Sequence, residues 1–153
     1  MKKVERTTDI LRTVRMMIKL YDKMLRSICD RYQLTQIEAD IISFLKNNPG
    51  KDTVGDIAEL RMLSKGNVSR GAEELIQRGL LRREQDPQDR RRMHLTLLPA
   101  ADPIVSEIQQ VRGRFLQKMF DGFGPEELEA YACFNKRIVA NIKTALERGE
   151  QHE

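Results

Sequence analysis

The stretch that decides the fold runs from Val54 to Gly79, VGDIAELRMLSKGNVSRGAEELIQRG, and it predicts two short helices joined by a tight turn. In the second helix, Val68, Ala72, Leu75 and Ile76 follow the i, i+4, i+7, i+8 spacing that places apolar side chains on one face. We therefore expect this face to be buried and the opposite face to remain free for a ligand.

The free face of this helix, residues 64–78, carries groups that can grip or read DNA. Ser64 is placed as the N-cap, which leaves N–H groups of the first turn available to a phosphate. Glu73 and Glu74 follow and would be repelled by phosphates, so we expect the N-terminal half to face a duplex, as in recognition helices. The predicted DNA-contacting residues here are Ser64, Lys65, Gly66, Asn67, Ser69 and Arg70. A surface helix whose charges are only solvated is the alternative that these residues alone leave open.

Two strands are expected directly after this helix, over residues 80–84 and 92–97. The second contains the alternating sequence MHLTL, which predicts that Met93 points inward and His94 outward. A two-stranded hairpin therefore follows the helix.

The loop between the strands is charged, and with the first residue of the second strand it forms a wing over residues 85–92, QDPQDRRR. Pro87 supplies turn geometry. Arg90 and Arg91 stand at the tip, and arginine on a thin projection suits the narrow minor groove of DNA, where the negative potential is enhanced. The wing is thus a second predicted DNA contact.

Taken together, these segments resemble the multiple-antibiotic-resistance regulator (MarR) family. The resemblance covers nearly the whole chain, and its most specific part is the run from residue 78 to residue 91. It implies that Asp89 braces the wing arginines, that Arg90 or Arg91 enters a minor groove, and that the helix after Ser64 enters the adjacent major groove. The residues that carry it are LTQIEADIISFL (34–45), DIAE to LSKGNVSR (56–70), ELIQRGLLRREQDPQDRR (74–91) and MHLTL (93–97).

Two positions depart from the family pattern. Met62 stands where many helix-turn-helix turns have glycine, so we expect a wider turn. Leu98 and Pro99 replace the threonine that commonly caps the next helix. We expect that helix to have Asp102 as its N-cap and Pro103 in its first position.

Long helices are predicted at both ends of the chain. Residues 9–32 carry apolar side chains spaced alternately 3 and 4 apart, a heptad stripe that suits packing along another long helix. Covering the core of its own domain is the alternative for this stripe. Apolar stripes also run through residues 104–120 and 125–146, and a break is expected at residues 121–124. The central lobe is too small to cover all of them, so we expect a twofold homodimer.

The predicted fold class is therefore mainly α, within α+β: a winged helix-turn-helix with long N- and C-terminal dimerisation helices. Residues 1–153 are expected to form one domain, made of a winged helix-turn-helix lobe (34–98) and dimerisation helices (5–33 and 100–147). A chain of 153 residues suits one core but not two.

Composition and charge fit a DNA-binding protein of the cytoplasm. The chain is 40% hydrophobic and 33% charged, lacks a long apolar run, and begins MKKVERTTD, which is unlike a signal peptide, so we expect no membrane partner. Residues 61–94 hold nine basic and five acidic residues, so their net charge of +4 equals that of the whole chain. Double-stranded DNA is the predicted partner.

Control by a small molecule or by oxidation is expected from the family. MarR-like proteins often respond to aromatic or phenolic ligands or to oxidation of a cysteine. Cys29 is the candidate redox sensor, although a buried structural thiol is the favoured alternative for both Cys29 and Cys133. The residues that could line an effector cavity, or simply form core, are Met16, Met17, Met24, Phe44 and Met62.

Enzymatic functions are not supported by the sequence. The two histidines, His94 and His152, form neither a metal-binding cluster nor a catalytic triad with other residues, and the glycines form no phosphate loop. We expect no catalytic residue, no metal and no cofactor. The predicted function is a DNA-binding transcriptional regulator, with a repressor favoured. A winged-helix module that docks a protein partner and a nonspecific architectural DNA binder are the alternatives.

Overall fold

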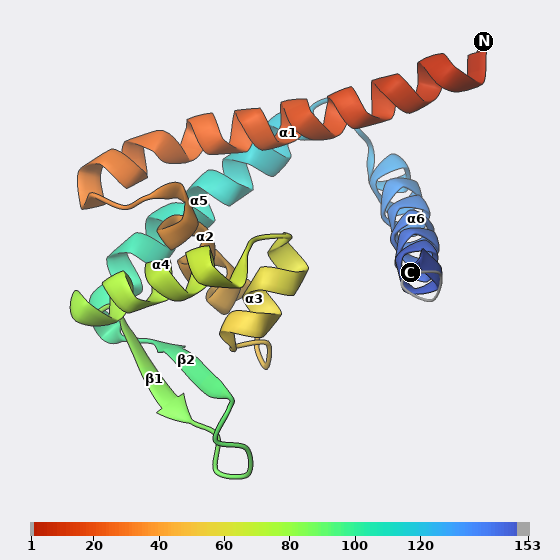
Figure 1. Ribbon diagram of the computed structural model, residues 1–153. Helices are drawn as coiled ribbons and strands as arrows, with labels where there is room; N and C mark the ends of the chain where they lie inside the picture. The colour runs from red at the N-terminus through yellow and green to blue at the C-terminus, as the bar shows by residue number, and fades with distance from the viewer. Residues whose placement is uncertain (1, 150–153) are drawn as a thin grey trace. The chain divides into compact units, whose positions relative to one another are not determined.

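The computed structural model describes the backbone of residues 2–149 and the side chains of residues 9–149. His152 lies outside these residues. The described chain is mainly helical with a two-stranded antiparallel sheet, as predicted (Figure 1). It forms two compact units, residues 1–115 and 116–153. The elements are α1 (Lys2–Tyr32), α2 (Gln36–Asn47), α3 (Val54–Arg61), α4 (Lys65–Gln77), β1 (Leu81–Gln85), β2 (Met93–Leu97), the 3-10 turn η1 (Pro99–Ala101), α5 (Asp102–Met119) and α6 (Pro125–Gly149).

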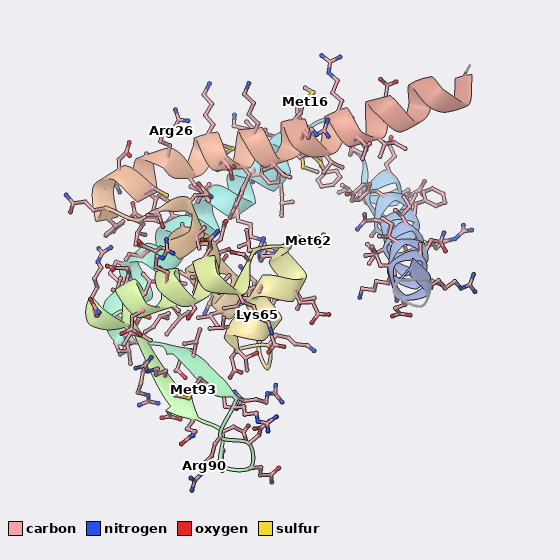
Figure 2. The ribbon with its side chains drawn as sticks, in the orientation of Figure 1. Met16, Arg26, Met62, Lys65, Arg90 and Met93 are labelled. Carbon is pink, nitrogen blue, oxygen red and sulfur yellow. The ribbon has the colours of Figure 1, made fainter. Side chains whose placement is uncertain are left out.

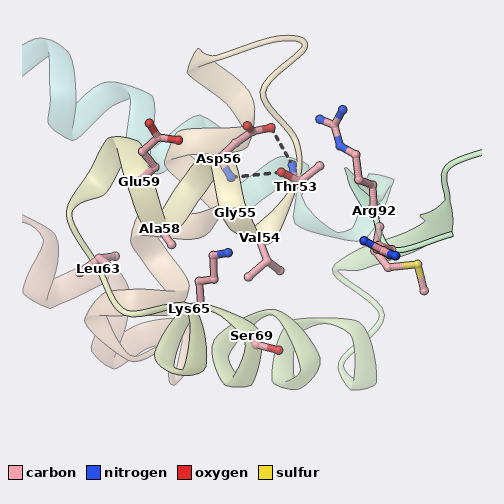
Figure 3. A pocket seen from close by; sticks show the side chains of 12 residues that line it. Thr53, Val54, Gly55, Asp56, Ala58, Glu59, Leu63, Lys65, Ser69 and Arg92 are labelled. Atoms are coloured by element: carbon pink, nitrogen blue, oxygen red, sulfur yellow. Dashed lines mark hydrogen bonds between the residues drawn. The ribbon is translucent and has the colours of Figure 1, made fainter. Parts of the chain in front are cut away.

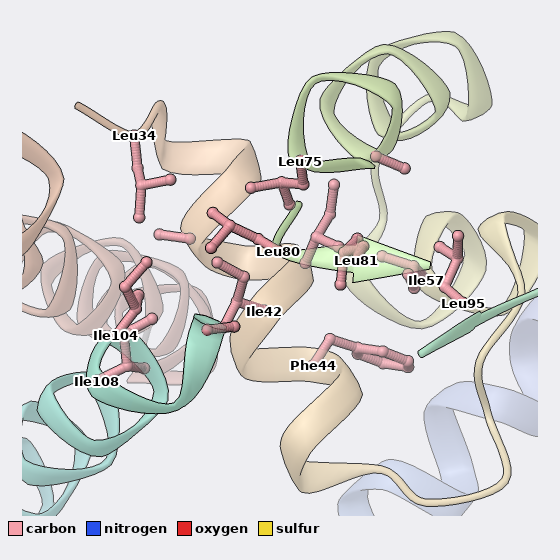
Figure 4. Close-up of a cluster of buried hydrophobic side chains, with 14 of the residues drawn as sticks. Leu34, Ile42, Phe44, Ile57, Leu75, Leu80, Leu81, Leu95, Ile104 and Ile108 are labelled. Atoms are coloured by element: carbon pink, nitrogen blue, oxygen red, sulfur yellow. The ribbon is translucent and has the colours of Figure 1, made fainter. Parts of the chain in front are cut away.

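Helix α2 forms the centre of the first unit. Thr35 caps its start by accepting a hydrogen bond from the backbone N–H of Glu38 at 3.2 Å. Ile41, Ile42 and Phe44 of α2 are at most 2% exposed and pack with buried side chains of α1, α3, α4, β1, β2 and α5 (Figure 4). This contiguous core is what holds the winged helix-turn-helix lobe together.

The turn between α3 and α4 is closed more tightly than the sequence suggested. Met62 adopts the left-handed conformation with φ of 56°. The N–H of Leu63 donates to the carbonyl of Ala58 at 2.9 Å, and the N–H of Met62 donates to the carbonyl of Glu59 at 3.4 Å. These two bonds form a Schellman motif, which usually places glycine at the left-handed position. The expected wider turn is therefore wrong, because methionine takes the conformation that glycine normally supplies.

The hairpin has the predicted strands, but its side chains do not alternate as expected. Leu81 pairs with Leu97 beside the core, whereas Gln85 pairs with Met93 at the end that leads into the wing. Met93 is 37% exposed, so the burial expected for it is wrong, whereas Leu95 on the same face of the strand is buried as expected. His94, which we expected outward, is half-buried. The hairpin projects beyond the core at this end, so the core does not cover the side chain of Met93 (Figure 1).

Helix α5 begins earlier than predicted. Asp102 has helical backbone angles, φ −54° and ψ −43°, and follows directly on the 3-10 turn that starts at Pro99. The prediction of Asp102 as an N-cap is therefore wrong. Pro99 occupies the first position of the turn, where a missing N–H costs nothing.

The helices at the two ends of the chain leave many apolar side chains exposed. In α1, Leu25 and Ile28 are buried in the core, but Leu11 and Ile18 nearer the N-terminus are 53% and 56% exposed. The prediction of one domain over residues 1–153 stays a prediction.

The second unit is formed by the end of α5, the break at residues 121–124 and α6. The ring of Phe120 meets those of Phe123 and Tyr131 edge to face, with centroids 5.6 and 4.9 Å apart, which fixes this turn. Along its whole described length α6 has no buried residue. The apolar stripe predicted for it is therefore uncovered within the second unit.

Candidate nucleic-acid interface

The recognition helix, α4, is held by the apolar face that the sequence predicted. Val68 and Leu75 are fully buried, and Ala72 is 3% exposed. Gly71 is also buried, which the sequence analysis missed: a Cβ at this position would lie 3.0 Å from Cδ1 of Ile41 in α2. The glycine thus lets α4 cross close over α2.

The start of α4 is capped as predicted. Ser64 accepts a hydrogen bond from the backbone N–H of Asn67 at 3.2 Å, and the helix begins at Lys65. Every residue assigned to DNA contact on this helix is exposed: Ser64, Lys65, Gly66, Asn67, Ser69 and Arg70. Their contact with DNA stays a prediction, but the surface needed for it is free in the described chain.

The far end of α4 is tied to the end of α1. Arg78, the C-cap of α4, donates from its guanidinium to the backbone carbonyls of Tyr32 at 2.6 Å and Gln33 at 3.1 Å. Gly79 then turns the chain with φ of 72°, a left-handed angle that glycine adopts without strain. These contacts set the direction in which α4 lies and in which the hairpin leaves it.

The wing turns around Asp86, a residue that the sequence analysis did not single out. Its Oδ1 accepts hydrogen bonds from the backbone N–H groups of Gln88 at 2.8 Å and Asp89 at 3.0 Å. The hydrogen bond from His94 and these two backbone bonds lower the pKa of Asp86 to about 2. An Asp-Pro dipeptide is a turn signal, so the sequence did contain a clue to this role.

Asp89 braces the backbone of the wing. Its Oδ1 accepts a hydrogen bond from the N–H of Arg91 at 3.0 Å, and its carbonyl accepts one from Arg92 at 3.1 Å. In the part of the chain that the structure describes, Asp89 forms no ion pair with Arg90 or Arg91. The bracing implied by the resemblance therefore acts on the main chain, and both guanidinium groups remain free.

His94 joins the wing to the rest of the lobe. Its Nδ1 lies 2.6 Å from Oδ1 of Asp52, and its Nε2 lies 2.7 Å from Oδ2 of Asp86. These hydrogen bonds, first that of Asp52 and then that of Asp86, raise the pKa of His94 above its usual 6.5. This contact was not predicted, because Asp52 is 42 residues away in the sequence. The β-bridge between Thr53 and His94 brings the two segments together.

A groove of about 780 Å³ separates the recognition helix from the wing (Figure 3). Lys65 and Ser69 of α4 line one side, and Arg91 and Arg92 of the wing line another. The floor includes the start of α3, where Thr53 and Asp56 form a complete capping box. Positively charged side chains on both sides of a groove suit a phosphate backbone lying within it.

In the described chain, the cations of α4 and of the wing are free of ion pairs, whereas two arginines of β1 are paired. Among the described residues, Arg82 is ion-paired with Glu84 at 2.8 Å and Arg83 with Glu73 at 2.9 Å. Within the same part of the chain, five cations of α4 and the wing have no acidic partner: Lys65, Arg70, Arg90, Arg91 and Arg92. Arg90 projects from the tip of the hairpin (Figure 2). The charge excess predicted from the sequence is therefore available to an anionic partner.

The residues proposed for control of binding do not gather at one place. Phe44 is part of the core, with the Arg61 guanidinium 5.6 Å from its ring centre, whereas Met16 and Met62 are 59% and 83% exposed. Side chains this exposed do not enclose a ligand within one subunit. Met24 is half-buried against the core, and Met17 is half-buried as well. An effector site stays a prediction.

The two thiols differ in their surroundings. Cys29 is half-buried, and burial together with the negative charges of Asp40 and its neighbours raises its pKa, which disfavours the reactive thiolate. Cys133 is exposed, so the expectation of a buried thiol there is wrong. It lies on α6, whose apolar face is uncovered within the second unit.

The described residues contain neither a candidate metal cluster nor a membrane-spanning helix. No group of three or more His, Cys, Asp or Glu side chains is arranged to hold a metal ion. Over the same residues, no helix is both long enough and apolar enough to cross a membrane.

Comparison with known proteins identifies similar sequences and folds. Residues 32–92 match the sequence model of the MarR family. The chain is 26% identical over 138 residues to the uncharacterised HTH-type transcriptional regulator YsmB of Bacillus subtilis, covering 90% of this chain and 92% of that protein. Its fold resembles that of a MarR family transcriptional regulator from Silicibacter pomeroyi (TM-score 0.74, 23% identity, 85% of this chain and 87% of that one). It also resembles S. aureus MepR in a complex with DNA (TM-score 0.67, 18% identity, 84% and 95%).

Proposed function

Because the protein belongs to the MarR family, we propose that it is a dimeric, sequence-specific DNA-binding repressor of transcription. In this proposal α4 enters the major groove of an operator and the wing, residues 85–92, enters the adjacent minor groove. The groove between them holds the phosphate backbone. A regulator of this kind acts on the chromosome, which places it in the cytoplasm.

One observation carries the proposal: cations from both the helix and the wing line the groove between them. Lys65 reaches into it from α4, and Arg91 and Arg92 line it from the wing (Figure 3). These side chains have no acidic partner among the described residues. A module that docks a protein partner has no need for unpaired cations on two sides of one groove, so this arrangement favours a nucleic acid.

The proposed dimer is supported by apolar side chains that this chain leaves uncovered. Four residues in the first half of α1 are 41–64% exposed: Ile10, Leu11, Val14 and Ile18. In α6 the exposed apolar residues recur every three or four positions, and they include Tyr131, Phe134, Ile138, Ile142 and Leu146. Faces of this length are normally covered in a soluble protein, and a second copy would cover them while presenting two recognition helices to two half-sites about 34–36 Å apart.

The proposal includes an inverted-repeat operator and release by a small ligand or by oxidation. A twofold dimer reads a sequence with the same twofold symmetry. Bound over a promoter, such a dimer would exclude RNA polymerase, which is why we propose repression. Release would follow from any effector that binds the DNA-free dimer more tightly than the DNA-bound one.

The first experiment measures DNA binding. Fragments that the protein selects from random DNA are sequenced, and the affinity for the enriched sequence is measured by fluorescence anisotropy at two salt concentrations. We expect an inverted repeat bound with nanomolar affinity that falls steeply with salt. Binding without sequence enrichment would indicate an architectural DNA binder, and no binding at low salt would indicate the docking module.

Variants locate the contacts. Arg91→Ala should weaken binding to all sequences and reduce the salt slope by about 1, because it removes a backbone contact. Arg70→Ala should instead cost about 1–3 kcal/mol of discrimination at one base position. Arg26→Ala is the matched control, since it removes the same charge from the opposite side of the first unit (Figure 2). Equal affinity of all three variants and the wild type would remove these assignments.

The oligomeric state is tested separately by size-exclusion chromatography with light scattering. We expect a dimer at micromolar concentration. Ile138→Glu, which places a charge on the uncovered face of α6, should yield monomers that bind DNA weakly. Glu129→Lys is the control, because it exchanges one exposed charge for another on the same helix. A monomeric wild type would contradict the proposed dimer.

A further inference from the structure

His94 lies between two carboxylates that come from different segments of the lobe. Asp52 precedes α3, and its Oδ1 is 2.6 Å from Nδ1 of the ring. Asp86 belongs to the wing, and its Oδ2 is 2.7 Å from Nε2. His94 itself is on β2, so one side chain connects the strand, the wing turn and the segment that leads into the helix-turn-helix.

The two contacts are satisfied together only when the ring carries two protons. An ionised carboxylate is an acceptor alone, and neutral imidazole has one N–H and one lone pair. With a neutral ring, one of the two carboxylates would face a lone pair at hydrogen-bonding distance. With imidazolium, both ring nitrogens donate, and both hydrogen bonds are charge-assisted. The geometry therefore selects the protonated ring.

The same contact controls the shape of the wing. Asp86 accepts from His94 through Oδ2 and from the backbone of Gln88 and Asp89 through Oδ1. Asp89 in turn holds the N–H of Arg91. A chain of hydrogen bonds thus runs from the ring of His94 to the backbone of the wing arginine. The N–H of Asp86 also donates to the carbonyl of Arg92 at 2.9 Å, and the side chain of Gln85 donates to the carbonyl of Arg90 at 3.0 Å. Residues 87–92 are all exposed, so hydrogen bonds rather than apolar burial fix the tip.

We propose that His94, as an imidazolium, is a positioning residue that holds the wing in its DNA-binding geometry and makes the wing's share of DNA affinity dependent on pH. The inference rests on the proposed function, because it assumes that the wing contacts DNA.

The sign of the pH dependence follows from the surroundings of the ring. Glu84 lies directly opposite His94 in the sheet and is paired with Arg82, while Arg92 is the nearest cation along the wing. The hydrogen bonds of Asp52 and Asp86 raise the pKa of His94 above 6.5. The stabilisation of the wing by protonated His94 is therefore fully present below about pH 6.5. It is lost as the pH rises through the raised pKa of His94. Raising the pH should release the wing.

The first test is a titration of the DNA-free protein by proton NMR. The sequence has two histidines, and their ring signals are assigned by the variants His94→Gln and His152→Gln. We expect His94 to titrate above 6.5. In Asp52→Asn, which keeps the shape of the side chain and removes its charge, the His94 pKa should fall. A His94 pKa at or below 6.5 in the wild type would overturn the proposal.

The second test measures operator affinity from about pH 6 to 8.5, where histidine is the side chain that normally titrates. Wild-type affinity should fall as the pH rises, by up to about tenfold for each unit by which DNA binding shifts the His94 pKa. His94→Gln should bind more weakly at low pH and show a flat profile, whereas His152→Gln should follow the wild type. Arg91→Ala should also flatten the profile, because the wing contact is then absent.

The outcomes separate this inference from the proposed function. Identical pH profiles for His94→Gln and the wild type would overturn the inference and leave the DNA-binding proposal intact. If His94→Gln does not fold, Asp52→Asn serves the same purpose: its affinity should fall at a lower pH than that of the wild type, and an unchanged midpoint would count against the inference. If the wild type binds no DNA, the proposed function fails while the NMR titration still reports the protonation of His94.

Discussion

The recognition helix and the wing line the same groove, but different forces hold them there. α4 is anchored by Val68 and Leu75, both fully buried in the core. The wing has exposed side chains throughout its tip and is positioned by hydrogen bonds centred on Asp86 and His94. Apolar burial does not depend on pH, whereas hydrogen bonds between ionised groups do.

The two proposed DNA contacts, α4 and the wing, should therefore respond to different solution conditions. The position of α4 should persist wherever the lobe is folded. The position of the wing should change with the protonation of a few side chains while the lobe remains intact. The following four predictions test this division, beginning with the largest effect.

Removing apolar volume beneath α4 should destabilise the lobe most. Leu75→Ala is expected to lower the free energy of unfolding by about 2–5 kcal/mol, because it deletes a fully buried side chain and leaves a cavity. The measurement is urea denaturation followed by circular dichroism. Gln77→Ala, on the exposed side of the same helix, should change stability by less than about 0.5 kcal/mol. A small effect of Leu75→Ala would show that α4 is not held by the core.

Adding volume where α4 crosses α2 should also destabilise the lobe, but less. Gly71→Leu is expected to cost about 1–3 kcal/mol, because Ile41 and Ile37 lie within 3.2 Å of the position of a Cβ. Gly66→Leu is the matched control, since nothing lies within 4 Å of its Cβ position. Thermal unfolding of the two variants should differ clearly, and equal melting temperatures would contradict the close crossing.

Removing the N-cap of α4 should have a still smaller effect. Ser64→Ala is expected to cost about 1 kcal/mol, because the N–H of Asn67 loses its acceptor. Ser69→Ala, within the same helix and exposed, is the control for the loss of a hydroxyl group. Both are compared by urea denaturation near neutral pH. If Ser69→Ala costs as much as Ser64→Ala, the cap contributes nothing of its own.

Acid should loosen the wing without unfolding the lobe. The pKa of Asp86 is lowered to about 2, so its contribution is present above its usual value of 3.8 and is lost as the pH falls through about 2. The amide protons of Gln88 and Asp89, which donate to this carboxylate, report the loss in NMR spectra. Their shifts should move with a midpoint below 3.8, whereas a midpoint near 3.8 would show that the turn does not depend on the ionised group.

The sequence alone was sufficient to predict the features of the structure that depend on local rules. The apolar spacing of α4, the Ser64 cap and the break before Pro125 were all predicted correctly, because each depends on residues within a few positions of one another. The exposed cations of the candidate site were identified for the same reason. Periodicity indicates which face is free, and charge indicates what that face can bind.

The sequence alone was insufficient to predict features that depend on contacts between distant segments or on where the core ends. Met93 continues an alternating pattern past the end of the core, so its position in the pattern did not predict burial. The contact of His94 with Asp52 depends on the path of residues 51–53 beside β2. Met62 in the left-handed conformation was unexpected because the preference for glycine is a local rule that the surrounding fold can override.

The contact of Arg78 with the last carbonyls of α1 has a consequence for engineering new operator preferences. The groups that would read bases occupy residues 64–70, whereas the guanidinium that orients α4 stands beyond its last turn. Reading and orientation are therefore encoded in separable parts of the sequence. Residues 64–70 can be replaced by those of another regulator while the contact of Arg78 that orients α4 is kept. A replacement that extends through residue 78 would change this orienting contact as well.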